Sequence, residues 1–332
     1  GRVGKFPNVV PVEIEVVDKN LERSQVYNLQ IIHDEELLPQ LSSVALLQAI
    51  DTTIDRQGAG TAQLDLEIMS NDLPEQELKR SNLYYSSNDI AANSLGDFIQ
   101  ALSLLTNNPF KEVNFANIKI KVEVSKKPRL ALLEEVNLNT KEVKAGDKIE
   151  AEIKFRPYRK ELITKNVTVE VPEEVEDGPL ELYVLSGQNA NLEQLTSSQN
   201  GDSNFQTNNI QDLEELIKIY KEQKQNNQLV VQLKESFSPG ARQAQTTAKA
   251  AEETEDKSKE NEEETEEEEE PENYNNNLVE EVLNTDYALQ GAVRKQIKVK
   301  TRDKGPEDKA RKNKKATSNE HKKTGNSSDD KK

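Results

Sequence analysis

The sequence predicts a small α+β unit followed by an immunoglobulin-like β-sandwich, with a disordered acidic insertion and a disordered basic tail. Three observations lead to this fold class. Short segments in which apolar and polar residues alternate recur along the chain, and this is the pattern of strands buried on one face. Apolar residues at helical spacing are concentrated before residue 112. The 332 residues are only 33% hydrophobic, so part of the chain is expected to be disordered.

Residues 1–112 form the predicted α+β unit. The polar residues Ser86 to Asp89 offer a helix N-cap, because a short side-chain oxygen can accept hydrogen bonds from free backbone amides. Apolar residues from Ile90 to Leu105 supply the stripe of that helix. The predicted order is β-β-α-β-β-α, with strands at 9–18, 26–32, 61–69 and 78–85 and a first helix at 40–55.

Residues 113–187 form the predicted sandwich. Five short alternating segments are separated by turn signals such as Asp177-Gly178-Pro179, which is typical of an antiparallel immunoglobulin-like sandwich. The five strands are expected at 118–124, 130–138, 148–155, 162–171 and 180–185. Residues 188–235 are predicted to be a loop, a short helix at 210–224 and a strand at 229–233. One last strand within 278–300 is expected to return to the folded body.

Two charged segments lie outside this predicted body, in a chain whose formal net charge is −17. Residues 236–277 are predicted to be a disordered acidic linker, since 252–272 hold 14 acidic residues against 2 Lys. Residues 301–332 are predicted to be a disordered basic tail. Counterion release would let this tail contact nucleic acid, anionic lipid or a wall polyanion, but it has no interleaved aromatic residues, so we expect only weak nucleic-acid binding. The acidic run of the same chain is an equal candidate partner.

The composition also limits chemistry and location. There is no Cys, which excludes disulfides and thiolate ligands. No apolar run approaches the roughly 20 residues of a membrane helix, so no membrane span is expected. The chain begins Gly1-Arg2-Val3-Gly4 without Met, and we expect a processed product or a part of a longer protein.

We predict no catalytic residue, no metal site and no cofactor. His33 is the one histidine outside the tail, and a general base would need an oriented nucleophile within hydrogen-bond reach. Asp51 and Asp55 lie four residues apart on a predicted helix and are interpreted as solvated side chains rather than cation ligands. The one surface that we single out for binding consists of Tyr84, Tyr85, Arg156, Tyr158 and Arg159.

Several segments resemble one known family. The stretch Ile54-Asp55-Arg56-Gln57-Gly58-Ala59-Gly60-Thr61-Ala62 precedes an alternating strand and the stretch from Ser81 to Ala92. Together with Thr106 to Phe110, Arg156 to Arg159 and the opening Gly1 to Gly4, it resembles the region that follows the protease domain in secreted SpoIVB-type serine peptidases. The resemblance covers about residues 1–235 and extends to 285–300; the acidic insertion and the basic tail depart from the family pattern.

The resemblance implies a role but no catalytic residue. The Gly-Ser-rich nucleophile segment of that family has no counterpart here, so no catalytic position can be transferred. We therefore expect an extracytoplasmic accessory region that positions a protease domain in cis or binds a substrate or cell-envelope partner. Three alternatives are a stand-alone surface-adhesion module, a hydrolase that uses His33, and a polyanion binder that acts through residues 301–332. The sequence does not predict the oligomeric state.

Overall fold

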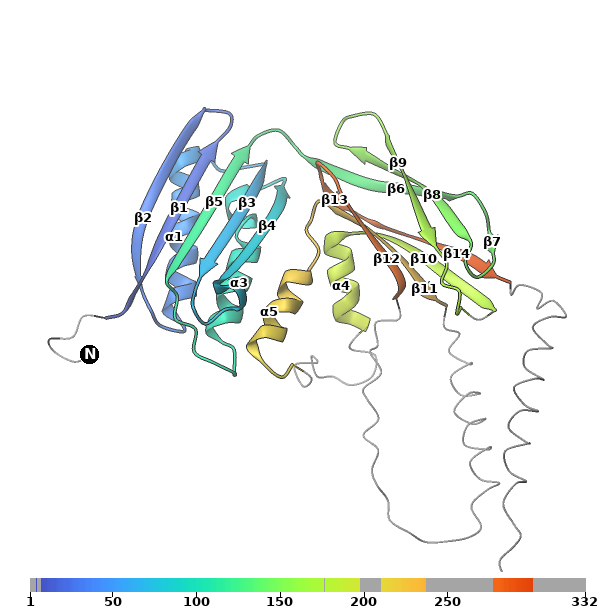
Figure 1. The fold of residues 1–332 in the computed structure, drawn as a ribbon. Helices are drawn as coiled ribbons and strands as arrows, with labels where there is room; N and C mark the ends of the chain where they lie inside the picture. Colours follow the sequence, from blue (N-terminus) through green and yellow to red (C-terminus); the bar gives the residue numbers. More distant parts are fainter. Residues whose placement is uncertain (1–3, 5–6, 176, 198–209, 237–276, 301–332) are drawn as a thin grey trace, which may run out of the picture.

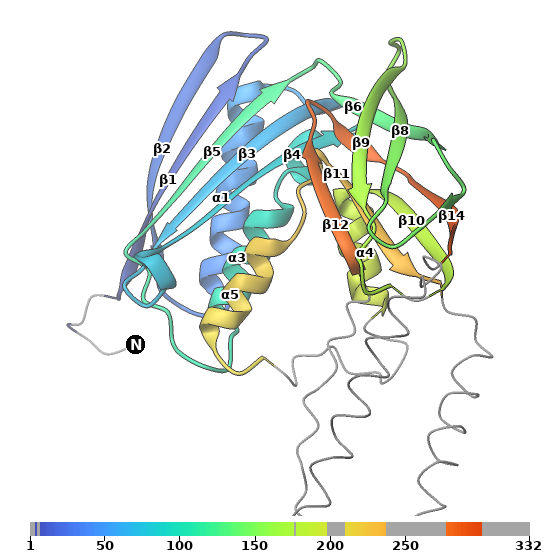
Figure 2. The ribbon, with the colours of Figure 1, turned by 45° about the vertical axis from the view of Figure 1, so that its right-hand side comes forward.

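The computed structural model describes residues 4, 7–175, 177–197, 210–236 and 277–300, which form two β-rich units side by side (Figures 1 and 2). As predicted, an α+β unit is followed by a mainly β unit. The acidic linker and the basic tail lie outside the described residues, apart from Ser236 and Asn277 at the ends of the linker.

The N-terminal unit is built on one five-stranded sheet with the order β2-β1-β5-β3-β4. Its elements are β1 (Val9–Asp18), β2 (Arg23–Ile32), α1 (Leu37–Ile54), β3 (Gly60–Met69), a 3-10 turn η1 (Pro74–Gln76), β4 (Glu77–Ser86), α2 (Ile90–Asn93), α3 (Gly96–Thr106) and β5 (Asn117–Ser125). Asp89 caps α2 as predicted, because its carboxylate accepts from the Ala92 N–H.

Strand alternation decides which face of this sheet is covered. In β1 the residues Val10, Val12, Ile14 and Val16 are buried, and their neighbours in the chain are more exposed. The buried side chains pack against α1, α2 and α3. Figure 1 shows α1 and α3 on one face of the sheet. The opposite face carries mainly charged side chains, such as Glu13, Asp65 and Lys119.

The second unit consists of two sheets that share one apolar core. The sheet orders are β12-β11-β10-β14-β7 and β13-β6-β8-β9. Its elements are β6 (Leu130–Leu138), β7 (Glu142–Val143), β8 (Lys148–Pro157), β9 (Ile163–Glu170), β10 (Gly178–Ser186), α4 (Gly187–Ser197), β11 (Gln228–Glu235), β12 (Asn277–Asn284), β13 (Ala288–Gln290) and β14 (Ala292–Val299). We call it the two-sheet unit. It includes two parallel pairs, β13 with β6 and β14 with β7, and is therefore not purely antiparallel.

One helix crosses back to the first unit. Helix α5 (Leu213–Glu222) lies in the chain between α4 and β11, two elements of the two-sheet unit. Its buried residues Leu213, Ile217 and Tyr220 nevertheless belong to the core of the N-terminal unit. The chain thus leaves α5 and enters β11 where the two units meet (Figure 2).

Three predicted boundaries are wrong. The strand at 118–124 is β5, which lies in the N-terminal sheet beside β1 and β3, so the first unit does not end at 112. The predicted loop after 187 begins with helix α4, and the predicted single strand within 278–300 is three strands that complete both sheets. The second unit therefore extends far beyond 113–187. Alternation predicts most of the strands but carries no information about their partners.

Candidate functional site at the junction of the two units

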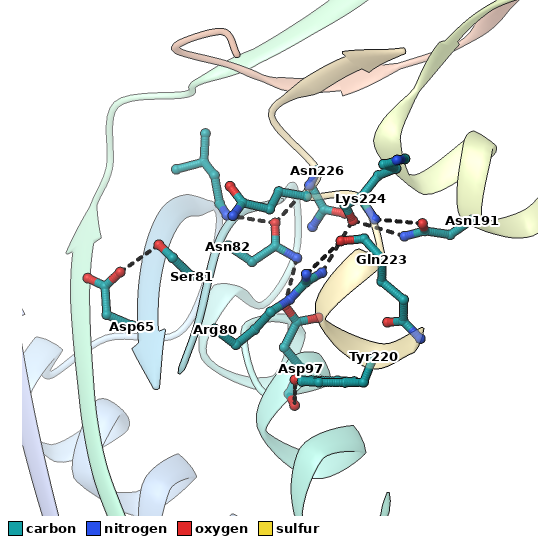
Figure 3. Close-up of polar contacts among 12 residues, drawn as sticks. Asp65, Arg80, Ser81, Asn82, Asp97, Asn191, Tyr220, Gln223, Lys224 and Asn226 are labelled. Carbon is teal, nitrogen blue, oxygen red and sulfur yellow. Dashed lines mark hydrogen bonds and ion pairs between the residues drawn. The ribbon is translucent and has the colours of Figure 1, made fainter. Parts of the chain in front are cut away.

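The strand β4 places polar side chains on a face that should be apolar. Leu78, Arg80, Asn82 and Tyr84 alternate toward the covered face of the sheet, and all four are buried. Leu78 and Tyr84 join the apolar core. Arg80 and Asn82 lie where β4, an edge strand, borders α5 and the start of β11, and there they find polar partners (Figure 3).

Arg80 is the centre of the junction. Its Nε donates to Asp97 Oδ2 at 2.7 Å. Its Nη1 donates to the Gln223 carbonyl oxygen at 2.6 Å, and its Nη2 to that of Lys224 at 3.3 Å. The guanidinium also lies 5.6 Å from the ring centroid of Tyr220. A buried guanidinium is stable only when its donors are satisfied, so these contacts fix the chain after α5 against β4.

Asn82 extends the network toward the second unit. Its Nδ2 donates to Asp97 Oδ2 at 3.0 Å, and its Oδ1 accepts from the backbone N–H of Asn226 at 2.7 Å. The Asn226 carbonyl in turn accepts from the N–H of Leu289, in β13, at 2.8 Å. One short path of hydrogen bonds thus connects α3, β4 and a strand of the two-sheet unit.

The backbone of Lys224 is held from both sides. Its carbonyl oxygen accepts from Arg80 and also from Asn191 Nδ2 in α4, at 2.9 Å. Its N–H donates to Asn191 Oδ1 at 2.8 Å. Because Arg80 belongs to the N-terminal unit and α4 to the two-sheet unit, a single peptide segment joins the two (Figure 3).

Two tyrosines complete the buried cluster around Asp97. The Tyr220 hydroxyl donates to the Asp97 carbonyl oxygen at 2.9 Å, and the Asp97 N–H donates to the Tyr84 hydroxyl oxygen at 3.0 Å. Burial, reinforced by the nearby Asp97 charge, raises the pKa of both Tyr84 and Tyr220 well above the ordinary range. Both phenols therefore stay neutral and act as hydrogen-bonding groups.

The predicted binding surface is not one surface. Tyr84 lies in the core and Tyr85 is half-buried on the other face of β4. Arg156 is exposed in β8 and makes a bidentate ion pair with Glu134, with the shorter contact at 2.6 Å. Tyr158 and Arg159 follow β8, and the Arg159 guanidinium lies 4.9 Å from the Tyr158 ring centroid. Only these last three residues lie near one another.

His33 contacts a carbonyl and an aromatic ring. Its Nε2 lies 3.0 Å from the Val113 carbonyl oxygen, which requires the proton to be on that nitrogen, and its ring centroid lies 5.7 Å from that of Phe115. His33 and Thr106 line one small hollow, and the Thr106 hydroxyl donates to the Leu102 carbonyl oxygen at 3.0 Å. The hydrolase alternative required a hydroxyl at His33, and the recorded partner is a carbonyl instead.

Asp51 and Asp55, expected four residues apart on one helix, do not both lie within α1. Asp51 is within α1, whereas Asp55 follows it in the left-handed conformation with φ of 47°. Burial, and then the charge of Asp89, raises the pKa of Asp51. No group of three or more His, Asp or Glu side chains arranged for a metal ion occurs in the described ranges.

The open face of the N-terminal sheet carries a shallow hollow of about 550 Å³. Acidic and basic side chains from neighbouring strands pair across it, as in Lys121 with Glu15 at 3.8 Å and Lys79 with Glu67 at 4.0 Å. The pairing neutralises the face, so it favours neither an anionic nor a cationic ligand.

Comparison with known proteins supplies no relative, so the junction between the two units is the main evidence about function. No family model, no curated protein and no solved structure matches this chain. Within the part of the chain that is described, no helix combines the length and apolarity that would span a bilayer. Arg80 and Asn82 were not among the predicted site residues, although two polar residues on the apolar register of a strand are a signal of a buried polar network.

Proposed function

We propose that this chain is a non-catalytic accessory region of an extracytoplasmic serine peptidase-like protein, in which it positions a protease domain or binds a substrate or cell-envelope partner. The observation that carries this proposal is the junction. The Arg80 side chain and the Lys224 backbone tie two folded units together through partly buried hydrogen bonds, which is what a rigid spacer requires.

The sequence resemblance gives this spacer its context. The post-protease region of SpoIVB-type peptidases would need to hold a separate catalytic domain at a fixed position. In this proposal the two-sheet unit is an immunoglobulin-like sandwich that acts as the distal spacer, since sandwich domains commonly serve this role, although a fold alone does not define a function.

The reading frame upstream of Gly1 provides the first test, because the proposal expects it to encode a protease domain. In that parent protein, Arg80→Met would loosen the junction without touching the catalytic domain. We expect cleavage of a short peptide to be unchanged and cleavage of a protein substrate to fall. Arg156→Met is the matched control, because Arg156 makes only an exposed ion pair.

Two results would contradict the proposal. One is an upstream frame without a protease domain, which would favour the adhesion module. The other is labelling of this chain alone by an activity-based serine-hydrolase probe, with the label lost in His33→Ala. That outcome would place catalysis within the N-terminal unit.

A further inference from the structure

The small hollow beside His33 lies between the start of α1 and the end of α3. Its volume is about 190 Å³. Small-molecule sites usually occupy about 300–1,000 Å³, so this hollow has the size for one side chain rather than for a cofactor. It shares no residue with the junction around Arg80, and its ligand is therefore a separate question from the proposed spacer role.

The floor of the hollow is apolar. Leu38 and Leu105 line it and are fully buried, and the Phe115 ring packs against that of His33. Phe110 also lines the hollow and is 38% exposed. An apolar floor accommodates the methylene stem of a long charged side chain, and an exposed aromatic ring attracts a cation to its face.

The side-chain donors that line the hollow are already engaged. His33 Nε2, the Thr106 hydroxyl and Asn108 Nδ2 each lie at most 3.0 Å from a main-chain carbonyl oxygen. The Lys111 ammonium group lies 2.7 Å from a carboxylate oxygen of Asp72, which compensates its charge. An anionic ligand would therefore find no donor here that is not shared with the protein itself.

The ends of two helices add to this preference for a cation. The N–H groups of Glu36 and Leu37, which open α1, donate to Asp34 Oδ1 at 3.1 and 3.0 Å. The positive end of that helix is thus already occupied by a carboxylate. Helix α3 ends at the hollow with Leu105 and Thr106, and the C-terminal end of a helix favours positive charge.

The free groups at the hollow are acceptors. The side chains of Glu35 and Glu112 line it, are exposed, and have no hydrogen-bond or ion-pair partner among the residues that the structure describes. With Asp34 they bring three negative charges, whereas the one positive charge, on Lys111, is paired with Asp72. The described residues hold no group suited to a metal ion, so the cation that fits must bring its own N–H donors.

We infer that this hollow binds the side chain of a lysine or arginine from a partner polypeptide. The methylene stem of that side chain lies on Leu38 and Leu105, and its ammonium or guanidinium group donates to Glu35 and Glu112. Both head groups are positively charged and carry only donors, which matches a site whose free groups are all acceptors. This assigns a ligand class to a site that the spacer role does not use.

Methyl NMR of the full chain, labelled at its Leu and Val methyl groups, tests this inference. The probes are Nα-acetyl-arginine amide and Nα-acetyl-lysine amide, with Nα-acetyl-citrulline amide as the uncharged analogue of the first, all at constant ionic strength. At least one basic probe should shift the Leu38, Leu105 and Val113 signals saturably, with a dissociation constant of about 10 mM or below. The citrulline probe should bind at least about fivefold more weakly, because a hydrogen bond between charged groups is stronger.

Two substitutions with the same charge change locate the binding. Glu112→Lys places a tethered ammonium group at the hollow and should raise the dissociation constant at least about tenfold. Glu22→Lys is the matched control, because Glu22 is exposed in the turn between β1 and β2, and it should leave binding unchanged. The methyl spectrum of each variant also shows whether it is folded.

Three results would overturn the inference. The first is the absence of saturable shifts at these methyl groups with both basic probes up to about 100 mM. The second is equally tight binding of the citrulline probe. The third is an equal loss of binding in Glu112→Lys and Glu22→Lys. Binding of one basic probe alone would support the inference and would decide between lysine and arginine.

Discussion

At the scale of single residues, Arg80 and Arg156 show how differently two arginines in this chain are placed. The side chain of Arg80 is 4% exposed and that of Arg156 is 47% exposed, yet both bind a carboxylate. Removing one partner of a buried pair leaves the other charge without compensation, whereas exposed pairs contribute little because water and salt screen them.

Arg80→Met should therefore lower the free energy of unfolding by about 3 kcal/mol or more, since Asp97 stays buried without its partner. Arg156→Met should lower it by less than about 1 kcal/mol. Urea titrations followed by circular dichroism measure both values. Equal effects of the two substitutions would show that the Arg80 contacts are not stabilising.

Asp72 makes a pH-dependent contribution. Hydrogen bonds from Lys111 and from the backbone and side chain of Asn114 lower its pKa to about 2. A folded pKa below the unfolded value of about 3.9 means that these contacts stabilise the fold above that pH. The stabilisation is lost as pH falls from about 4 to about 2.

The stability difference between wild type and Asp72→Asn should accordingly shrink across that window. Urea unfolding at several pH values, with carboxyl NMR to follow Asp72 itself, measures it. Lys111→Met is the control, because it should raise the Asp72 pKa toward its ordinary value. A stability difference that does not change with pH would exclude this role of Asp72.

At the scale of elements, the start of α4 depends on a glycine. A Cβ at Gly187 would overlap the Gln225 carbonyl, which belongs to the segment that joins α5 to β11. Gly187→Ala should destabilise the protein by about 1–3 kcal/mol, because the backbone must move apart. Gly178→Ala is the matched control, since nothing lies within 4 Å of its added Cβ. Similar thermal midpoints for the two variants would refute the close approach.

The helices and strands were more predictable than the elements with which they pair or pack. The alternation in 9–18 and the cap at Asp89 depend on neighbours in the chain, and the structure has both as expected. The parallel pairing of β1 with β5 joins Val12 to Ile118, and no local pattern carries information about such a distant contact. Helix α4 was missed because its Gln- and Asn-rich sequence has little apolar periodicity.

At the scale of the whole molecule, two units were expected, but their connection was not. The segment 210–235 was predicted as a helix and a strand after the sandwich. In the structure its helix, α5, packs in the core of the N-terminal unit, and its strand, β11, packs in the core of the two-sheet unit. The junction around Arg80 follows from this crossing, and sequence reasoning missed it because the partners of Arg80 are main-chain carbonyls, which every residue possesses.

The central claim is that the junction fixes the two units in one arrangement, and pulsed electron–electron spin resonance tests it most directly. The chain contains no Cys, so Lys119→Cys in β5 and Lys165→Cys in β9, both exposed, can carry the only two spin labels. Dilution with unlabelled chain removes distances between copies. We predict a single narrow distance distribution that broadens when Arg80→Met is added. A broad distribution without Arg80→Met would contradict the claim.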